Sequence, residues 1–232
     1  MRRAVWARCA ERFAAGSRLL EMNCGTGEDA LWLVQRGVQV LATDVSPGML
    51  RVARDKLAAY PAGARARFQR LAWEDLESFE AAPFDGALSN FGGLNCVPDL
   101  RIAARGLGAR LRPGATAILC IMGPVVPWEW AWFLAQGKPA KAFRRLRRGA
   151  AQWSGIQIHY HSIANARRAF APEFRVLRES AIGAVLPPPY TEQRLGRYPQ
   201  VIAALDRVER RFETLWPLPR LADHYLMELE RL

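Results

Sequence analysis

The chain has 232 residues, of which 50% are apolar and 24% charged, and its formal net charge at pH 7 is +11. This composition is typical of a globular α/β domain and excludes the disordered, collagen-like, coiled-coil and disulfide-rich classes. No run of 18 apolar residues indicates a membrane-spanning helix, and the basic residues near Met1 do not form a secretory signal.

The four cysteines form no C-x-x-C pair and no cluster with the three histidines, so we expect a reduced, cytoplasmic protein without a metal site. Arginine greatly outnumbers lysine, which is typical of a compositional bias rather than of a binding surface. We therefore do not expect a nucleic-acid partner, although a basic surface can bind nucleic acid or anionic lipid. The sequence leaves the oligomeric state open.

The first 123 residues alternate short apolar runs with amphipathic ones. Strands are expected over residues 18–24, 38–44, 66–72, 84–90 and 116–123, with helices over 27–36, 46–60 and 98–111. Ser46 is the expected N-cap of the second helix, with Pro47 at its first position, and Pro113-Gly114 is an expected turn. The alternation predicts a doubly wound, mostly parallel sheet within a single domain over residues 1–232.

A different pattern follows. Residues 124–151 are rich in Trp and Arg and predict an inserted helical pair that acts as a cap. Beyond it we expect strands over 155–160 and 174–181, helices over 163–170 and 200–215, a turn-rich segment over 186–190, and a terminal strand or helix over 224–232.

A glycine-rich turn lies between the first strand and the first helix, over Glu21 to Gly27, and Asp44 follows 17 residues after Gly27 at the end of the second strand. Glycines here let the backbone approach a ligand, and an acid at the next strand end can accept both hydroxyls of a ribose. The pattern predicts a nucleoside site. Residues 25–30 read G-T-G-E-D-A, a variant of the dinucleotide fingerprint that leaves NAD formally open.

The stretches LLEMNCGTGEDALWLVQRGVQVLATDVSPGMLRVARDKL and FDGALSNFGGLNCVPDL, with the L-R-P-G-A turn before the fifth strand, resemble the cofactor half of a class I S-adenosylmethionine-dependent methyltransferase. The resemblance covers residues 16–123. It implies a Rossmann-like, seven-stranded sheet whose last strand, over residues 223–231, is antiparallel. It also implies S-adenosylmethionine as the cofactor.

Site residues are implied position by position. The methionine and ribose parts of the cofactor would contact Glu21, Cys24, Gly25, Thr26 and Gly27, and the ribose hydroxyls would bind Asp44. The adenine would pack on Val45 and Met49 and meet Ala72, Trp73 and Glu74 at its edge, while Asn90 and Phe91 would lie beside the sulfonium.

The sequence departs from the family at three places. Many relatives have Gly where Asn23 stands, a change that the family tolerates. Many relatives have an acid near position 72; here the acid is missing or displaced to Glu74, and Trp73 is an alternative stacking partner for adenine. Relatives also carry a segment before the first helix, which here begins near Met1. Either the start of the chain is truncated, or the covering of the cofactor comes from elsewhere, such as the Trp-rich insertion or a partner chain.

Candidate acceptor-side residues are less tightly defined. His159 and His161 alternate on one face of the expected strand, so either is a candidate general base, or both are ordinary strand-end histidines. Candidate substrate contacts are Asn95, Trp128 and Tyr160. Glu129 is expected in a surface salt bridge, with a cationic acceptor as the alternative. The basic residues from Lys138 to Arg148 are expected on a solvated face, with a membrane-surface or anion contact as the alternative.

The sequence therefore predicts methyl transfer from S-adenosylmethionine to a small molecule with an apolar or aromatic part. Two other functions stay open: methylation of a nucleic acid such as RNA, and a catalytically silent partner subunit of the same fold. The Asn-Pro-aromatic motif typical of base amino methylation is absent, because Asn90 is followed by Phe91 and Gly92.

Overall fold

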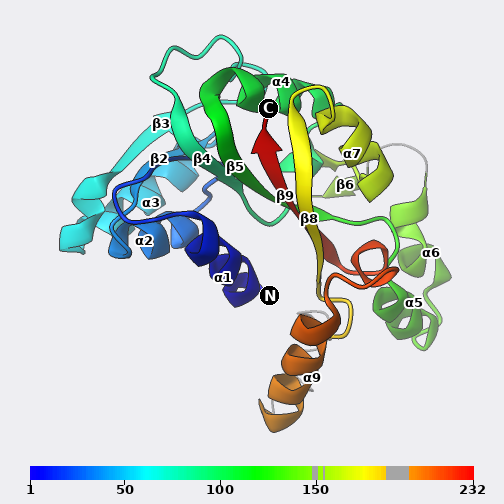
Figure 1. Ribbon diagram of the computed structural model, residues 1–232. Coiled ribbons are helices and arrows are strands. Elements are labelled where there is room, and N and C mark those ends of the chain that lie inside the picture. Colours follow the sequence, from blue (N-terminus) through cyan, green and yellow to red (C-terminus); the bar gives the residue numbers. More distant parts are fainter. Residues whose placement is uncertain (148–150, 154, 187–198) are drawn as a thin grey trace.

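A computed structural model describes residues 1–147, 151–153, 155–186 and 199–232. Its centre is a seven-stranded sheet with the order β3-β2-β1-β4-β5-β9-β8 (Figure 1). The strands are β1 (Arg18–Met22), β2 (Gln39–Asp44), β3 (Ala66–Arg70), β4 (Phe84–Ser89), β5 (Leu111–Met122), β8 (Phe174–Ile182) and β9 (His224–Arg231). The first five pair in parallel, and β9 is antiparallel to both neighbours, which confirms the expected doubly wound, Rossmann-like class.

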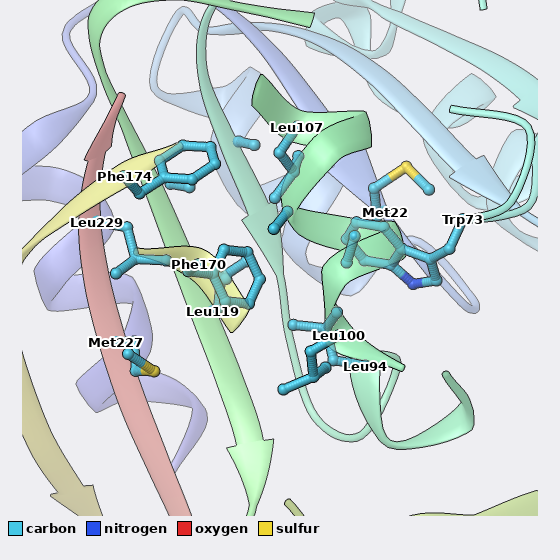
Figure 2. Close-up of a cluster of buried hydrophobic side chains, with 14 of the residues drawn as sticks. Met22, Trp73, Leu94, Leu100, Leu107, Leu119, Phe170, Phe174, Met227 and Leu229 are labelled. Carbon is cyan, nitrogen blue, oxygen red and sulfur yellow. The ribbon is translucent and has the colours of Figure 1, made fainter. Parts of the chain in front are cut away.

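Helices cover both faces of the sheet. One face packs against α1 (Arg2–Arg12), α2 (Glu28–Gln35) and α3 (Pro47–Ala58) through a buried apolar cluster. The other face packs against α4 (Leu100–Arg110) and α7 (Ile163–Phe170) through a second cluster, part of which Figure 2 shows. The central strands β1 and β4 and the second half of β5 are mostly buried, because helices cover both of their faces, whereas the edge strands β3 and β8 carry exposed residues. Ser46 caps α3 and Pro47 is its first residue, as expected.

The parallel strands end at one edge of the sheet, here called the carboxyl edge. The loops after β1, β2 and β4 lie at this edge. His224, the first residue of antiparallel β9, lies there too, because it pairs with Met122, the last residue of β5. Ligands of open α/β sheets bind at this edge, where neighbouring loops diverge.

The insertion contains the expected helical pair, α5 (Pro127–Leu134) and α6 (Pro139–Ala142), which pack together near the start of β9 (Figure 1). A short 3-10 turn, η3 (Arg144–Leu146), precedes a separate hairpin of β6 (Ala151–Trp153) and β7 (Ile156–Ile158). Among the other described elements, helix α9 (Pro199–Phe212) projects from the body (Figure 1), and η1 (Pro61–Arg65), η2 (Leu94–Cys96) and η5 (Leu218–Arg220) are 3-10 turns in loops.

Two sequence expectations are wrong. The strand expected over 155–160 is only β7, which ends at Ile158 and belongs to the hairpin rather than to the main sheet. Pro113-Gly114 is no separate turn, because β5 already begins at Leu111 opposite Phe84, with a register shift before Gly86. The expected turn at 186–190 lies almost wholly outside the described residues. In the described part of the chain, no helix is long and apolar enough to cross a membrane.

Candidate active site at the carboxyl edge

The two glycines of the turn after β1, Gly25 and Gly27, have different roles. Gly25 and Gly27 both have left-handed backbone conformations, with φ of +54° and +77°. A Cβ on Gly27 would lie 2.9 Å from the Cβ of Ala53, so this glycine lets α2 and α3 approach each other. A Cβ on Gly25 would meet no atom within 4 Å. Gly25 therefore presents bare backbone to an open cradle where a ligand can lie.

Asp44, the last residue of β2, is held beside this turn by two backbone amides. Its Oδ2 accepts a hydrogen bond from the Gly25 N–H and its Oδ1 accepts one from the Ser46 N–H, each over 2.9 Å. The carboxylate is 8% exposed. Because each carboxylate oxygen has a second lone pair, this group can still accept a pair of hydroxyls.

Apolar surface adjoins Asp44. Val45 and Met49, which follow Asp44 closely along the chain, are 49% and 45% exposed and offer apolar surface to a ligand. Ala72 is partly exposed and Glu74 exposed, so both stay candidates for the ligand edge. The stacking role considered for Trp73 is wrong: its ring is buried against Met22 in the core (Figure 2), and its Nε1–H donates to Asn23 Oδ1 over 2.7 Å.

A buried acidic group lies behind the glycine turn. Burial, reinforced by the nearby charge of Asp29, raises the pKa of Glu21 well above its ordinary value. Asp29 accepts hydrogen bonds from Trp6 Nε1 over 2.6 Å and from Asn90 Nδ2 over 3.0 Å, and it pairs with Arg2. Among the described residues, Glu21 Oε2 and Asn90 Oδ1 have no hydrogen-bond partner. Two buried acceptors are therefore free to receive donors from a ligand.

The side chain after Asn90 is held in a rare conformation. Phe91 has φ +43°, which is costly for a bulky residue. The Arg2 guanidinium lies 5.1 Å from the centre of its ring, and the His224 ring meets it edge-on at 5.2 Å. Contacts from α1 and β9 thus fix this ring at the carboxyl edge.

Cys24 and Thr26 lie in the same turn, and neither side chain is activated for a reaction. Burial raises the pKa of the Cys24 thiol, which disfavours the reactive thiolate. Thr26 Oγ1 lies 3.5 Å from Lys56 Nζ. Within the described residues, the four cysteines are free and no group of three metal-ligating side chains forms.

Asn95 is not a substrate contact. Its side chain is fully buried, and both ends of its amide are occupied: Oδ1 accepts from the Met122 N–H, and Nδ2 donates to the Met122 and His159 carbonyls. Asn95 therefore fastens η2 to the end of β5 and to the loop after β7.

The two expected histidines do share one side of the chain, since the rings of His159 and His161 stack 6.1 Å apart. His161 is buried, its Nε2 lies 2.9 Å from the Val97 carbonyl, and burial lowers its pKa. This setting favours a neutral ring that donates Nε2–H to the core. A base role for either histidine stays a prediction, as do the substrate contacts of half-buried Tyr160 and of Trp128 on α5.

Four ionisable residues that the sequence did not bring together meet beside Phe91: Glu129, Arg145, Asp223 and His224. Arg145 Nη2 lies 2.6 Å from Asp223 Oδ1 and 2.8 Å from Glu129 Oε2. Asp223 Oδ2 lies 2.9 Å from His224 Nδ1. Glu129 is 1% exposed and also pairs with Arg144, so the expected surface salt bridge is wrong. Arg145, which lies within the insertion, is also buried, because it bridges the acids Glu129 and Asp223, and the solvated face expected for it is wrong too.

One signal in the sequence could have indicated His224. The adjacent pair Asp223-His224 stands directly before the terminal strand, and an antiparallel last strand begins at the carboxyl edge. No comparable signal exists for Arg145, which lies 78 residues from Asp223 along the chain.

Comparison with known families gives a direct match for part of the chain. Residues 19–114 match the model of the methyltransferase domain family. A ubiquinone biosynthesis O-methyltransferase of Xanthomonas axonopodis pv. citri is 32% identical over 105 residues, 45% of this chain and 43% of that protein. A demethylmenaquinone methyltransferase of Clavibacter sepedonicus is 35% identical over 114 residues, 49% and 44% of the two chains. The match spans less than half of these relatives' own length.

Solved structures resemble the whole chain in fold. An S-adenosylmethionine-dependent methyltransferase from Mesorhizobium loti superimposes with a TM-score of 0.67 at 21% identity, over 98% of both chains. The methyltransferase CcbJ from Streptomyces caelestis gives 0.65 at 16% identity, over 100% of this chain and 94% of the other. The fold therefore continues beyond residue 114 to the end of the chain.

Proposed function

Because residues 19–114 match the methyltransferase domain family, we propose that this chain is a class I S-adenosylmethionine-dependent methyltransferase and that it methylates a small molecule with an apolar or aromatic part. When bound, the cofactor supplies a methyl group already activated by its sulfonium. The protein's tasks are then to hold the cofactor, align the acceptor with the methyl carbon and exclude water.

The setting of Asp44 is the observation that carries this proposal. Its carboxylate is fixed by the Gly25 and Ser46 amides beside a turn whose backbone is open at Gly25. A carboxylate in this place suits the two ribose hydroxyls of a nucleoside. Val45 and Met49 then offer apolar surface for the adenine.

The buried polar groups behind the turn suit the methionine part of the cofactor. Glu21 Oε2 and Asn90 Oδ1 are buried acceptors without donors among the described residues, and the ammonium group of a methionine moiety supplies donors. Binding of a cation would also favour the ionised form of Glu21, whose pKa is raised in the fold.

The class of the acceptor is inferred from the names of relatives and from the aromatic rings near the buried charged cluster. Two relatives carry names that refer to quinone biosynthesis, and both act on small molecules by those names. In this chain the rings of Phe91 and Tyr160 lie near the same charged cluster, which suits an acceptor with an aromatic part.

A turnover assay tests the proposal. We expect the wild-type protein to produce S-adenosylhomocysteine from S-adenosylmethionine with at least one member of a panel of hydroxylated aromatic compounds, measured by mass spectrometry. Asp44→Ala should lose this activity at low cofactor concentration, whereas Asp55→Ala, an exposed acid on α3, should keep it. Turnover only with RNA would contradict the acceptor class, and cofactor binding without any turnover would favour the silent partner.

A further inference from the structure

The insertion presents large apolar side chains to the solvent. Those that are between 40% and 48% exposed are Trp128 and Leu134 on α5, Phe143 after α6, and Leu146 in η3. The Trp130 ring packs against the Phe143 ring, with 5.5 Å between their centres, so the aromatic side chains of α5 and of the chain after α6 adjoin. Single exposed apolar residues are ordinary, but aromatic and aliphatic side chains gathered on one small unit indicate an interaction surface.

The surface of the insertion is also basic. Lys138, Lys141 and Arg147 are exposed. Residues 100–172 contain a single acid, Glu129, which is buried against two arginines. The insertion therefore offers no carboxylate of its own to neutralise these cations at its surface, and an anionic partner complements it.

Helix α9 is attached to the body by its acidic side chains. Glu209 accepts hydrogen bonds from three backbone amides after β8 over 2.8–3.1 Å, and Glu213, the residue after the helix, pairs with Arg8 of α1. Several apolar side chains of α9 and of the turn after it stay outside this attachment. Those that are between 43% and 77% exposed are Val201, Val208, Phe212, Leu215 and Trp216. A helix that buries acids and leaves apolar side chains in solvent is the reverse of an ordinary surface helix, which indicates a partner for the apolar side chains.

Both surfaces extend from the carboxyl edge of the sheet. The Gly183 N–H donates to Glu209 of α9, and the Gly183 carbonyl accepts a hydrogen bond from the Asp223 N–H over 3.2 Å. Asp223 in turn pairs with Arg145 of the insertion. Figure 1 shows α5, α6 and α9 beyond the same end of the sheet, so an extended surface can contact all three helices.

The chemistry of the two surfaces favours a lipid bilayer over a macromolecule. A symmetric contact with a second copy would bring the same cations of the insertion together. A nucleic acid suits the cations and the aromatic rings, but Leu134, Leu146 and Val201 offer nothing to a phosphate. In an anionic bilayer each kind of side chain has a partner, because lysine and arginine contact headgroup phosphates, tryptophan lies at the headgroup level and aliphatic side chains reach the acyl boundary.

We propose that the insertion, over residues 127–147, and α9 with the turn up to Trp216 form a docking face for a bilayer that contains anionic phospholipids. The charges of Lys138, Lys141 and Arg147 attract the face to the bilayer, and the exposed apolar side chains insert at the headgroup boundary. Docking in this way places the carboxyl edge of the sheet against the membrane. This inference goes beyond the proposed function and does not depend on it, because binding to lipid needs neither cofactor nor acceptor.

Vesicle sedimentation measures the contribution of the charges. The wild-type protein should bind vesicles of phosphatidylcholine and phosphatidylglycerol in equal parts, and should bind vesicles of phosphatidylcholine alone far more weakly. The triple variant Lys138→Gln, Lys141→Gln, Arg147→Gln should bind the anionic vesicles about 100-fold more weakly, because each cation near a membrane surface strengthens binding several-fold. Equal binding of the wild type to both kinds of vesicle, or binding to neither, would overturn the proposal.

A matched control separates the docking face from the overall charge of the protein. The triple variant Arg51→Gln, Arg65→Gln, Arg67→Gln removes the same charge from exposed residues of α3, η1 and β3. It should keep nearly the whole affinity of the wild type, and thermal melting shows whether each variant is folded. Equal losses in the two triple variants would show that lipid binding follows net charge alone, which would overturn the docking face.

The apolar part of the face is tested by the quenching of tryptophan fluorescence with lipids brominated in their acyl chains. Quenching should decrease in Trp216→Phe and stay unchanged in Trp32→Phe, because Trp32 stacks on Trp6 away from the face. The double variant Leu134→Ser, Leu146→Ser should bind anionic vesicles about 10-fold more weakly. Equal quenching in all proteins, with unchanged affinity of the double variant, would show that no side chain enters the bilayer and would overturn the proposal.

Two further measurements address other occupants of the face. In sedimentation velocity without lipid, a dimer that Leu134→Ser, Leu146→Ser dissociates would assign the surface to a second copy. A single-stranded RNA of mixed sequence that the wild type binds more tightly than anionic vesicles, and that the insertion triple variant does not bind, would assign it to a nucleic acid. We expect neither result, and either would overturn the proposal.

Discussion

The side of the carboxyl edge that we propose for the cofactor, here called the cofactor side, is built from backbone around Gly25 and Asp44. The side that we propose for the acceptor, here called the acceptor side, is built from buried side chains around Arg145. On the cofactor side, Gly25 offers bare peptide and Asp44 is held by two amides that lie close to it in the fold. On the acceptor side, Arg145 of the insertion joins Glu129 to Asp223 before the last strand. The first arrangement joins residues that lie close together along the chain. The second joins residues that are far apart in the sequence and meet only in the folded protein.

The largest expected effect comes from removing the charge at the centre of the acceptor side. Arg145→Met would leave Glu129 and Asp223 as buried carboxylates without their shared cation, and should lower the free energy of unfolding by about 3–5 kcal/mol. Urea denaturation measures this loss. As a control, Arg101→Met removes an exposed arginine paired with Asp99 and should leave the stability nearly unchanged, because water screens an exposed ion pair. Similar small losses in both variants would show that the buried network has no special role.

On the cofactor side, two glycine variants can separate the effect of the glycine turn on stability from its effect on ligand binding. Gly27→Ala forces a Cβ to within 2.9 Å of Ala53 in a left-handed conformation, and should cost about 2–4 kcal/mol of stability. Gly25→Ala meets no protein atom and should cost only about 1–2 kcal/mol, the conformational part.

For ligand binding, the substitution at Gly25 should have the larger effect. The methyl of Gly25→Ala projects into the open cradle, so this variant should stay folded and lose most of its affinity for S-adenosylhomocysteine. Thermal melting with and without the ligand gives both quantities. A Gly25→Ala protein that binds as the wild type does would contradict the placement of the ligand against this backbone.

A smaller effect on stability is expected at Glu21, where the substitution by Gln should stabilise the protein rather than destabilise it. Burial, and next the charge of Asp29, raises its pKa, so the folded state resists ionisation that the unfolded state allows. Below the unfolded pKa of about 4.3, both states are protonated and Glu21→Gln should be as stable as the wild type. As the pH rises above that value, the wild type loses stability relative to the variant.

At neutral pH, Glu21→Gln should therefore be more stable by about 0.5–2 kcal/mol while binding the cofactor more weakly. Melting curves at pH 4 and pH 7.5 measure the difference. Equal stability of the two proteins at both values would show that Glu21 bears no penalty in the fold.

The same contrast explains how far the sequence could be interpreted. The glycine turn, Asp44 and the Ser46 cap depend on neighbours within one loop or one strand–helix unit, so residue type and spacing sufficed to predict them. Trp73 and Asn95 also lie in loops at the carboxyl edge, but their side chains turn inward, because Asn23 and Met122 offer them hydrogen bonds that only the folded chain brings close. Glu129 is buried for the same reason, since its partners come from a later part of the insertion.

The most direct test of the account is a calorimetric titration with S-adenosylhomocysteine of three proteins: wild type, Asp44→Ala and His224→Asn. We expect the wild type to bind with a dissociation constant on the order of micromolar, Asp44→Ala to bind at least about 100-fold more weakly, a loss of about 3 kcal/mol, and His224→Asn to bind as the wild type does. Wild-type affinity in Asp44→Ala would contradict the nucleoside site, and a matching loss in His224→Asn would contradict the separation of the cofactor side from the acceptor side.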